Sequence, residues 1–228
     1  MKSPSIIFRD SLEEVHQLLE IHTYITGKGP GRRHSVEVLN KSAILFACAF
    51  FEAFIEKLAT NAFDFIVAKA DNHDALPKFI KQSIAKKLKD DPNEIKVWEL
   101  AGNGWHTVAA NYRSALVEKY IGTFNTPKPG NIESLLKNLI GFDGVDKCFT
   151  WKKMSAKKSK EKLKQFVELK GALAHGEQPA PKVLKADVVG YLKFLAPLSV
   201  RLSNDVCLYV QKQSGHAPWE IAHFGVIE

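Results

Sequence analysis

A lysine and a histidine five positions apart are the residues best suited to chemistry in this chain. In the segment 159–176, apolar residues recur at helical spacing, and Lys170 falls in the middle of the arc that they form on a helical wheel. A cation inside an apolar arc is costly unless it is paired, extends to water, or faces a cleft or an interface. Such departures from a regular pattern tend to mark functional sites, so Lys170 is a candidate functional cation.

His175 is suited to carrying a proton. In an unbroken helix its side chain would point about 140° away from that of Lys170. The two converge only if the helix ends near Ala174, as Gly176 suggests, or if they meet across a dimer. At a helix C-terminus the positive imidazolium is favoured, which suits this residue to proton transfer. The structural alternative is that the lysine extends to solvent and the histidine merely ends the helix.

Glu52 is a second candidate, because it is a carboxylate within the longest apolar stretch of the chain. It projects from the expected helix on the side of Leu45 and Cys48. A buried carboxylate needs a partner, and we expect Glu52 either to pair with Lys170 or to orient His175. A salt bridge to some other lysine or arginine would explain it equally well.

Positive charge is concentrated just before the lysine–histidine segment. The chain has a formal net charge of +7 and a pI of about 9.2, which is compatible with a polyanionic partner. Much of the excess lies in 152–160, where Lys157, Lys158 and Lys160 are candidates for contacting phosphates. A solvated entrance to the following helix would give the same pattern.

Several other chemistries lack their signatures. The eight histidines have no metal-ligand spacing, so we expect no metal site, and we expect no cofactor. The glycine-rich stretch 27–31 has neither the Lys-Ser/Thr ending nor the preceding strand of a phosphate-binding loop. No serine or cysteine lies in a recognisable nucleophile motif.

The cysteines and the apolar segments indicate a cytoplasmic protein. Cys48, Cys148 and Cys207 are far apart and lack paired spacing, as expected for reduced thiols. The first eight residues hold too few apolar side chains for a signal peptide. The apolar run 43–51 is too short to span a bilayer, so we expect no membrane partner.

Helical periodicity runs through the chain, and clusters of proline and glycine divide it. Ser11 and Glu14 predict a capping box at the start of the first helix, and Asn131 predicts the cap of a short one. The segment 35–69 is apolar on nearly every side, which predicts a central helix covered by others. The expected helices are 11–26, 35–69, 75–89, 107–120, 132–140, 155 or 159 to 174, and 186–213.

These elements predict an all-α protein, a bundle of about four main helices with extra short helices. No alternating strand pattern is longer than a few residues. The length of 228 residues suits a single domain over 1–228. Its expected core is about 8–213, and the mixed composition of the tail, 214–228, predicts no particular structure.

Four segments of the chain resemble the HEPN superfamily. The stretch Leu169-Lys170-Gly171-Ala172-Leu173-Ala174-His175-Gly176 is similar to the HEPN signature, an arginine followed by a polar residue, three more residues and a histidine. Segments 39–54, 98–105 and 125–132 resemble the RiboL-PSP-HEPN branch. Together the four cover about 8–213, and their order and spacing are more specific than the short signature alone.

The resemblance implies a metal-independent endoribonuclease that acts as a homodimer. Two signatures would face each other across a two-fold axis and form a composite cleft. An RNA 2′-hydroxyl would attack the adjacent phosphate there, with His175 as the general acid and base and Lys170 stabilising the charge on the phosphate. Relatives of this kind suggest a role in stress response or phage defence.

The signature departs from the family pattern at two positions. Lys170 replaces the arginine and loses its two-pronged grip on phosphate. Gly171 replaces the polar residue and has no side chain to donate or accept a hydrogen bond. Three hypotheses therefore remain open: a ribonuclease, weakened or not; an inactive module of the HEPN type that binds RNA or a protein partner; and a helical dimer with a purely structural role.

Overall fold

The computed structural model describes residues 1–27, 36–176, 179 and 181–223. Over these residues the chain is all-α, as predicted, and the one strand-like feature among them is an isolated bridge between Trp151 and Met154. Four of the described helices have 20 residues or more, in agreement with a bundle of about four main helices. These are α1 (Pro4–Thr26), α2 (Glu37–Lys69), α8 (Ala156–His175) and α9 (Lys185–Ser214).

Shorter helices connect α2 to α8. They are the 3-10 helices η1 (His73–Ala75) and η2 (Glu94–Leu100) and the α-helices α3 (Lys78–Lys89), α4 (Gly104–Asn111), α5 (Arg113–Ile121), α6 (Pro129–Ile140) and α7 (Val145–Cys148). The helix expected over 107–120 is therefore two helices, which meet at Tyr112. The predicted start of the second helix at residue 35 and most of the glycine-rich stretch 27–31 lie outside the described residues.

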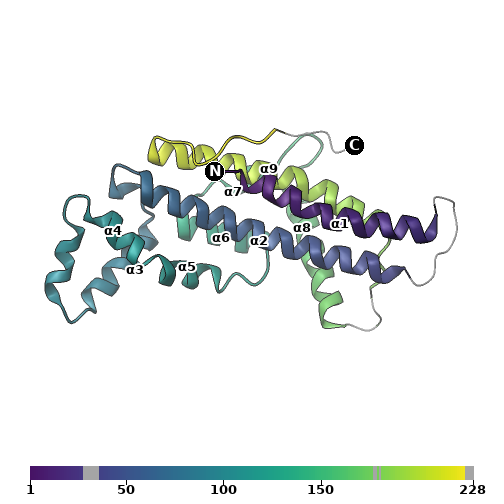
Figure 1. The fold of residues 1–228 in the computed structure, drawn as a ribbon, viewed down its shortest axis with the longest axis horizontal. Helices are drawn as coiled ribbons and strands as arrows, with labels where there is room; N and C mark the ends of the chain where they lie inside the picture. Colours follow the sequence, from purple (N-terminus) through teal and green to yellow (C-terminus); the bar gives the residue numbers. More distant parts are fainter. Residues whose placement is uncertain (28–35, 177–178, 180, 224–228) are drawn as a thin grey trace.

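Helix α2 is the centre of the arrangement. It packs against α1 and α9 along one side and against α6 and α8 on another (Figure 1). The lobe formed by α3, η2 and α4 lies near the C-terminal end of α2 (Figure 1). Three phenylalanines fix the contact of α1 with α2, since the ring of Phe8 lies 5.7 Å from that of Phe51 and 5.4 Å from that of Phe54.

Both of the predicted helix caps are wrong. Helix α1 begins at Pro4, and Ser11 lies inside it, where its hydroxyl donates to the carbonyl of Ile7 at 3.1 Å. Helix α6 begins at Pro129, so Asn131 lies in its first turn and donates to the carbonyl of Thr126 at 2.9 Å. In both helices a proline supplies the start, because its fixed φ suits the first turn.

One face of α2 is not covered, although a helix apolar on nearly every side was expected to be. Val38 is 63% exposed and Phe46 is 47% exposed, and Ala49 and Ala53 are also exposed. By length and composition alone α2 could cross a membrane, but the central helix of a bundle passes the same test. An apolar face left open on a central helix is typical of a protein interface.

The tail beyond α9 folds back on that helix, which the sequence did not predict. The indole of Trp219 donates to the carbonyl of Ser203 at 3.2 Å. Asn204 binds the backbone of Ala222 twice, donating to its carbonyl at 2.8 Å and accepting from its amide at 3.0 Å. The described part of the tail is therefore fixed along α9.

Candidate functional site

Helix α8 carries the predicted lysine and histidine on an end that projects from the bundle. Ser155 caps its start by accepting from the amide of Lys158 at 3.4 Å, and Gly176, with φ of 65°, ends it in the left-handed conformation. Its buried residues end at Val167. Figure 1 shows the remaining part of the helix extending away from α1, α2 and α9.

Lys170 lies on α8 where it faces α2, and it is half-buried. Burial raises the pKa of Glu52, and the positive charge of Lys170 opposes that rise. Burial likewise raises the pKa of the Cys48 thiol to about 12, with Lys170 again acting in the opposite direction. The charge of Lys170 therefore reaches both α2 residues.

The amine of Lys170 is nevertheless not engaged. No described residue lies within hydrogen-bond or ion-pair distance of it, so its proximity to Glu52 is electrostatic and not a direct salt bridge. Glu56 lies one helical turn further along α2, and both burial and the charge of Glu52 raise its pKa. Lys170 is thus a half-buried cation near Glu52, and its amine has no hydrogen-bond or ion-pair partner among the described residues.

His175 is the last residue of α8 and is exposed. It forms no hydrogen bond or ion pair with the described residues, so the structure does not bring it to Glu52. Because the helix continues to His175, regular geometry places its side chain about 140° around the axis and about 7.5 Å along it from Lys170. One chain therefore does not bring Lys170 and His175 together.

The predicted phosphate-contacting lysines lie at the opposite end of α8. Lys157 and Lys158 are exposed in its first turn, about 27 Å along the axis from His175 at 1.5 Å per residue. Lys160 forms an ion pair with Asp146, and its amine lies 5.8 Å from the centre of the Phe149 ring. Two of the three lysines are thus free to meet a ligand, but far from the signature of the same chain.

Lys162 was missed by the sequence analysis, and it links α8 to α9. Its amine donates to the carbonyl of Gly190 at 3.0 Å and lies 5.7 Å from the ring of Tyr191 and 5.4 Å from that of Phe194. Burial lowers the pKa of this lysine. Its place at the edge of the apolar arc of α8 was the available signal, but the sequence does not show that α9 supplies the carbonyl and the rings.

The open face of α2 adjoins this region. On a helical wheel Glu52 lies between buried Cys48 and exposed Ala49, so the carboxylate borders the apolar face. Phe46 and Phe50 stack on that face with ring centres 6.0 Å apart. On α8, Leu169 and Leu173 are only partly buried. We call the apolar surface formed by the exposed residues Val38, Phe46, Ala49 and Ala53 and the partly buried residues Phe50, Leu169 and Leu173 the α2–α8 face.

Gly171 has room for a side chain. A Cβ atom built on it meets no described atom within 4 Å. The polar residue of the HEPN signature is therefore not excluded here by packing. Among the described residues, no group of three histidine, cysteine, aspartate or glutamate side chains could hold a metal ion.

Comparison with protein families gives one match. The family model described as RiboL-PSP-HEPN matches residues 9–207, which include α2, α8 and most of α1 and α9. Neither the search of curated proteins nor the search of solved structures found a match. The match spans every residue of the candidate site.

Proposed function

Because this chain belongs to the RiboL-PSP-HEPN family, we propose that it is a metal-independent endoribonuclease that acts on RNA as a homodimer. The observation that carries the proposal is the state of Lys170. Its amine is half-buried beside Glu52 and has no direct partner among the described residues, as expected for a cation reserved for an anionic ligand. Excess positive charge over the whole chain favours RNA as that ligand.

The α2–α8 face supports the dimer. A monomeric protein rarely leaves a contiguous apolar patch exposed, and an isologous contact lets the same patch cover itself in a second copy. The face lies beside Glu52 and Lys170, so a two-fold axis through it would bring the two α8 ends toward each other. His175 of one copy could then approach Lys170 of the partner subunit, which helical geometry prevents within one chain.

In the proposed reaction the 2′-oxygen of a ribose attacks the adjacent phosphorus and the bond from phosphorus to O5′ breaks. The products are a 2′,3′-cyclic phosphate and a 5′-hydroxyl. His175 of one copy takes the proton from the 2′-hydroxyl and then, as the imidazolium, gives it to the leaving O5′. Protons and charge balance without a further reactant.

Lys170 would stabilise the negative charge that develops on the phosphate oxygens. Its amine is a point charge, so it would hold one oxygen where the arginine of the family signature would hold two. Glu52 would keep the lysine side chain extended along α2 until RNA displaces that weak attraction. Lys157 and Lys158 would contact phosphates further along the strand, since they lie far from the signature.

The second candidate function is an inactive module of the same family that binds RNA or a protein partner. Lys170 and Gly171 favour it, because both weaken the grip on phosphate. For either function we expect a cytoplasmic protein, in keeping with three free and buried cysteines, and a role in stress response or phage defence.

The test is RNA cleavage in EDTA, with analysis of the 3′ ends for 2′,3′-cyclic phosphate. Wild-type protein is compared with His175→Ala and with the matched control His73→Ala, an exposed histidine of η1. We expect cleavage by wild type and by the control and none by His175→Ala. Equal cleavage by all three proteins would remove His175 from the mechanism. Salt-sensitive RNA binding by all three without cleavage would favour the binding module.

A further inference from the structure

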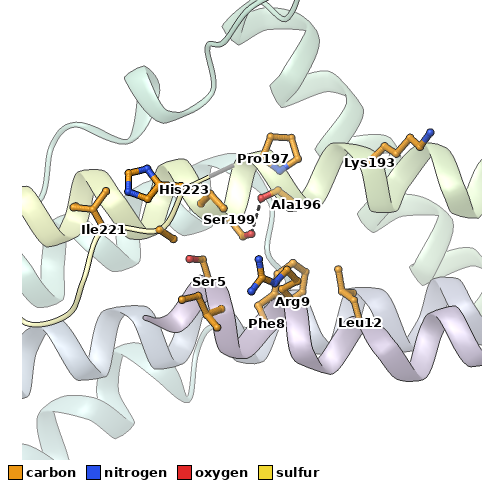
Figure 2. A pocket seen from close by; sticks show the side chains of 13 residues that line it. Ser5, Phe8, Arg9, Leu12, Lys193, Ala196, Pro197, Ser199, Ile221 and His223 are labelled. Carbon is orange, nitrogen blue, oxygen red and sulfur yellow. Dashed lines mark hydrogen bonds between the residues drawn. The ribbon is translucent and has the colours of Figure 1, made fainter. Parts of the chain in front are cut away.

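A cavity on the other side of the bundle has no part in the proposed cleavage. It has a volume of about 550 Å³ and lies between α1, α9 and the folded-back tail. None of the residues that line it belongs to α8 or to the α2–α8 face. The apolar part of its lining comes from Ile6, Phe8, Leu12, Ala196, Pro197, Val200, Ile221 and Ala222 (Figure 2).

Each wall of this cavity is held in place. The α1 wall is fixed by a serine chain, in which Ser3 lies 3.0 Å from both Ser5 and Ser203. The tail wall is fixed by the two hydrogen bonds of Asn204 to the backbone of Ala222. The cavity is thus preformed, mostly apolar and of the size that small-molecule sites have.

The polar groups of the cavity are basic or neutral. Arg9 lines it from α1, and Figure 2 shows its guanidinium in the gap between α1 and α9. This guanidinium forms no hydrogen bond or ion pair with the described residues, and His223 lies on the opposite wall. The neighbouring carboxylate of Asp10 is already bound to Lys2 at 2.5 Å. Lys193 also lines the cavity, but its amine extends away from the other side chains in Figure 2.

We propose that this cavity binds a small amphipathic anion, whose apolar body fills the space between α1 and α9 and whose carboxylate or phosphate binds Arg9. A guanidinium forms charge-assisted hydrogen bonds with either headgroup, and an apolar ligand body matches the lining. None of the described residues that line the cavity is acidic, so none would repel such a ligand. Ligand binding would also hold the tail against α9, because Ile221 and His223 form its third wall.

Titration calorimetry with the full chain tests the proposal. The probes are decanoate and decyl phosphate, kept below the concentrations at which they form micelles, and decanol serves as the uncharged control. We expect at least one of the two anions to bind at one site per chain, and about tenfold or more tighter than decanol. The anion that binds with the higher affinity identifies the headgroup that the site prefers.

Three variants assign the binding to this cavity. Arg9→Gln should weaken anion binding about tenfold or more. Lys193→Gln is the matched control, because it removes a cation whose amine points away from the cavity, and it should change anion binding less than about threefold. Ala196→Trp should fill the cavity and abolish binding, with thermal unfolding as the check that the protein is folded. The proposal is overturned if neither anion binds, if decanol binds as well as the anions, or if Arg9→Gln and Ala196→Trp bind like wild type.

Discussion

Lys170 illustrates how much of the site can be inferred from a single residue position. Its place in the apolar arc of α8 marked it as a candidate functional cation, and the structure has it half-buried with its charge acting on Glu52. A helical wheel could not reveal the role of Lys162, because the groups that bind its amine belong to α9. Nor could it test the proposed meeting of His175 with Lys170 of the partner subunit, because that depends on a second copy.

The first prediction at the scale of single residues concerns the charge of Lys170. Lys170→Met should lower the single-turnover rate of RNA cleavage by about 10²–10³-fold, the usual effect of removing one group that stabilises transition-state charge. Lys170→Arg should retain or raise the rate, because the guanidinium can hold two phosphate oxygens. A rate unchanged in Lys170→Met would assign the charge stabilisation to another group.

Glu56 gives a prediction on pH and stability. Burial and the charge of Glu52 raise its pKa in the folded state, so the protonated form stabilises the fold below the pKa of the unfolded chain, about 4.3. That stability is lost as the pH rises through the raised folded value. Glu56→Gln should therefore have a higher melting temperature than wild type at pH 7, and the difference should vanish near pH 4.

Glu37 serves as a control, because its pKa is shifted in the opposite direction. A hydrogen bond from Lys41 lowers its pKa, so its ionised form stabilises the fold above the unfolded pKa, and this stability is lost as the pH falls through the lowered value. Glu37→Gln should lower the melting temperature slightly at pH 7. Melting curves in which both variants shift in the same direction would contradict the assigned environments.

At the scale of elements, the long helices were predictable and their starts were less so. Helical spacing of apolar residues over many turns predicts α2 and α9 to within two residues at each end. The caps predicted at Ser11 and Asn131 were wrong, because a side chain that can cap a helix can also lie inside one and donate to a preceding carbonyl. Helices as short as η2 and α7 have too few turns to leave a periodic pattern.

Gly171 provides the prediction for α8. A Cβ at this position meets open space, so Gly171→Ala should stabilise the protein by about 0.5–1 kcal/mol through the helix propensity of alanine. Gly104→Ala is the matched control at the start of α4, where the new Cβ would lie 1.9 Å from the carbonyl oxygen of Glu99 and must destabilise the fold. Chemical denaturation measures both, and a loss of stability in Gly171→Ala would mean that α8 packs more closely than described.

At the scale of the whole molecule, the open side of the central helix is the feature that the sequence predicted wrongly and that matters most. Apolar composition on all sides of α2 predicted complete cover, because a sequence cannot distinguish cover by the same chain from cover by another. The described fold leaves the α2–α8 face exposed next to the signature. A second copy would complete the bundle and the site together.

Phe46 tests this explanation of the exposed face. Phe46→Lys should convert the dimer to a monomer, seen by light scattering after gel filtration, and should abolish cleavage although Lys170 and His175 are intact. Phe79→Lys, on α3, is the matched control, because Phe79 is 45% exposed and Phe46 is 47% exposed. Cleavage by a monomeric Phe46→Lys variant would separate the activity from the dimer.

The most direct test of the composite site is complementation between two inactive variants. His175→Ala and Lys170→Met are co-expressed with different affinity tags, and the heterodimer is isolated and assayed on RNA in EDTA. Each heterodimer contains one site in which His175 of one copy meets Lys170 of the partner subunit, so we expect cleavage to return, although neither homodimer cleaves. A heterodimer as inactive as its parents, beside an active wild type, would contradict a site shared between two chains.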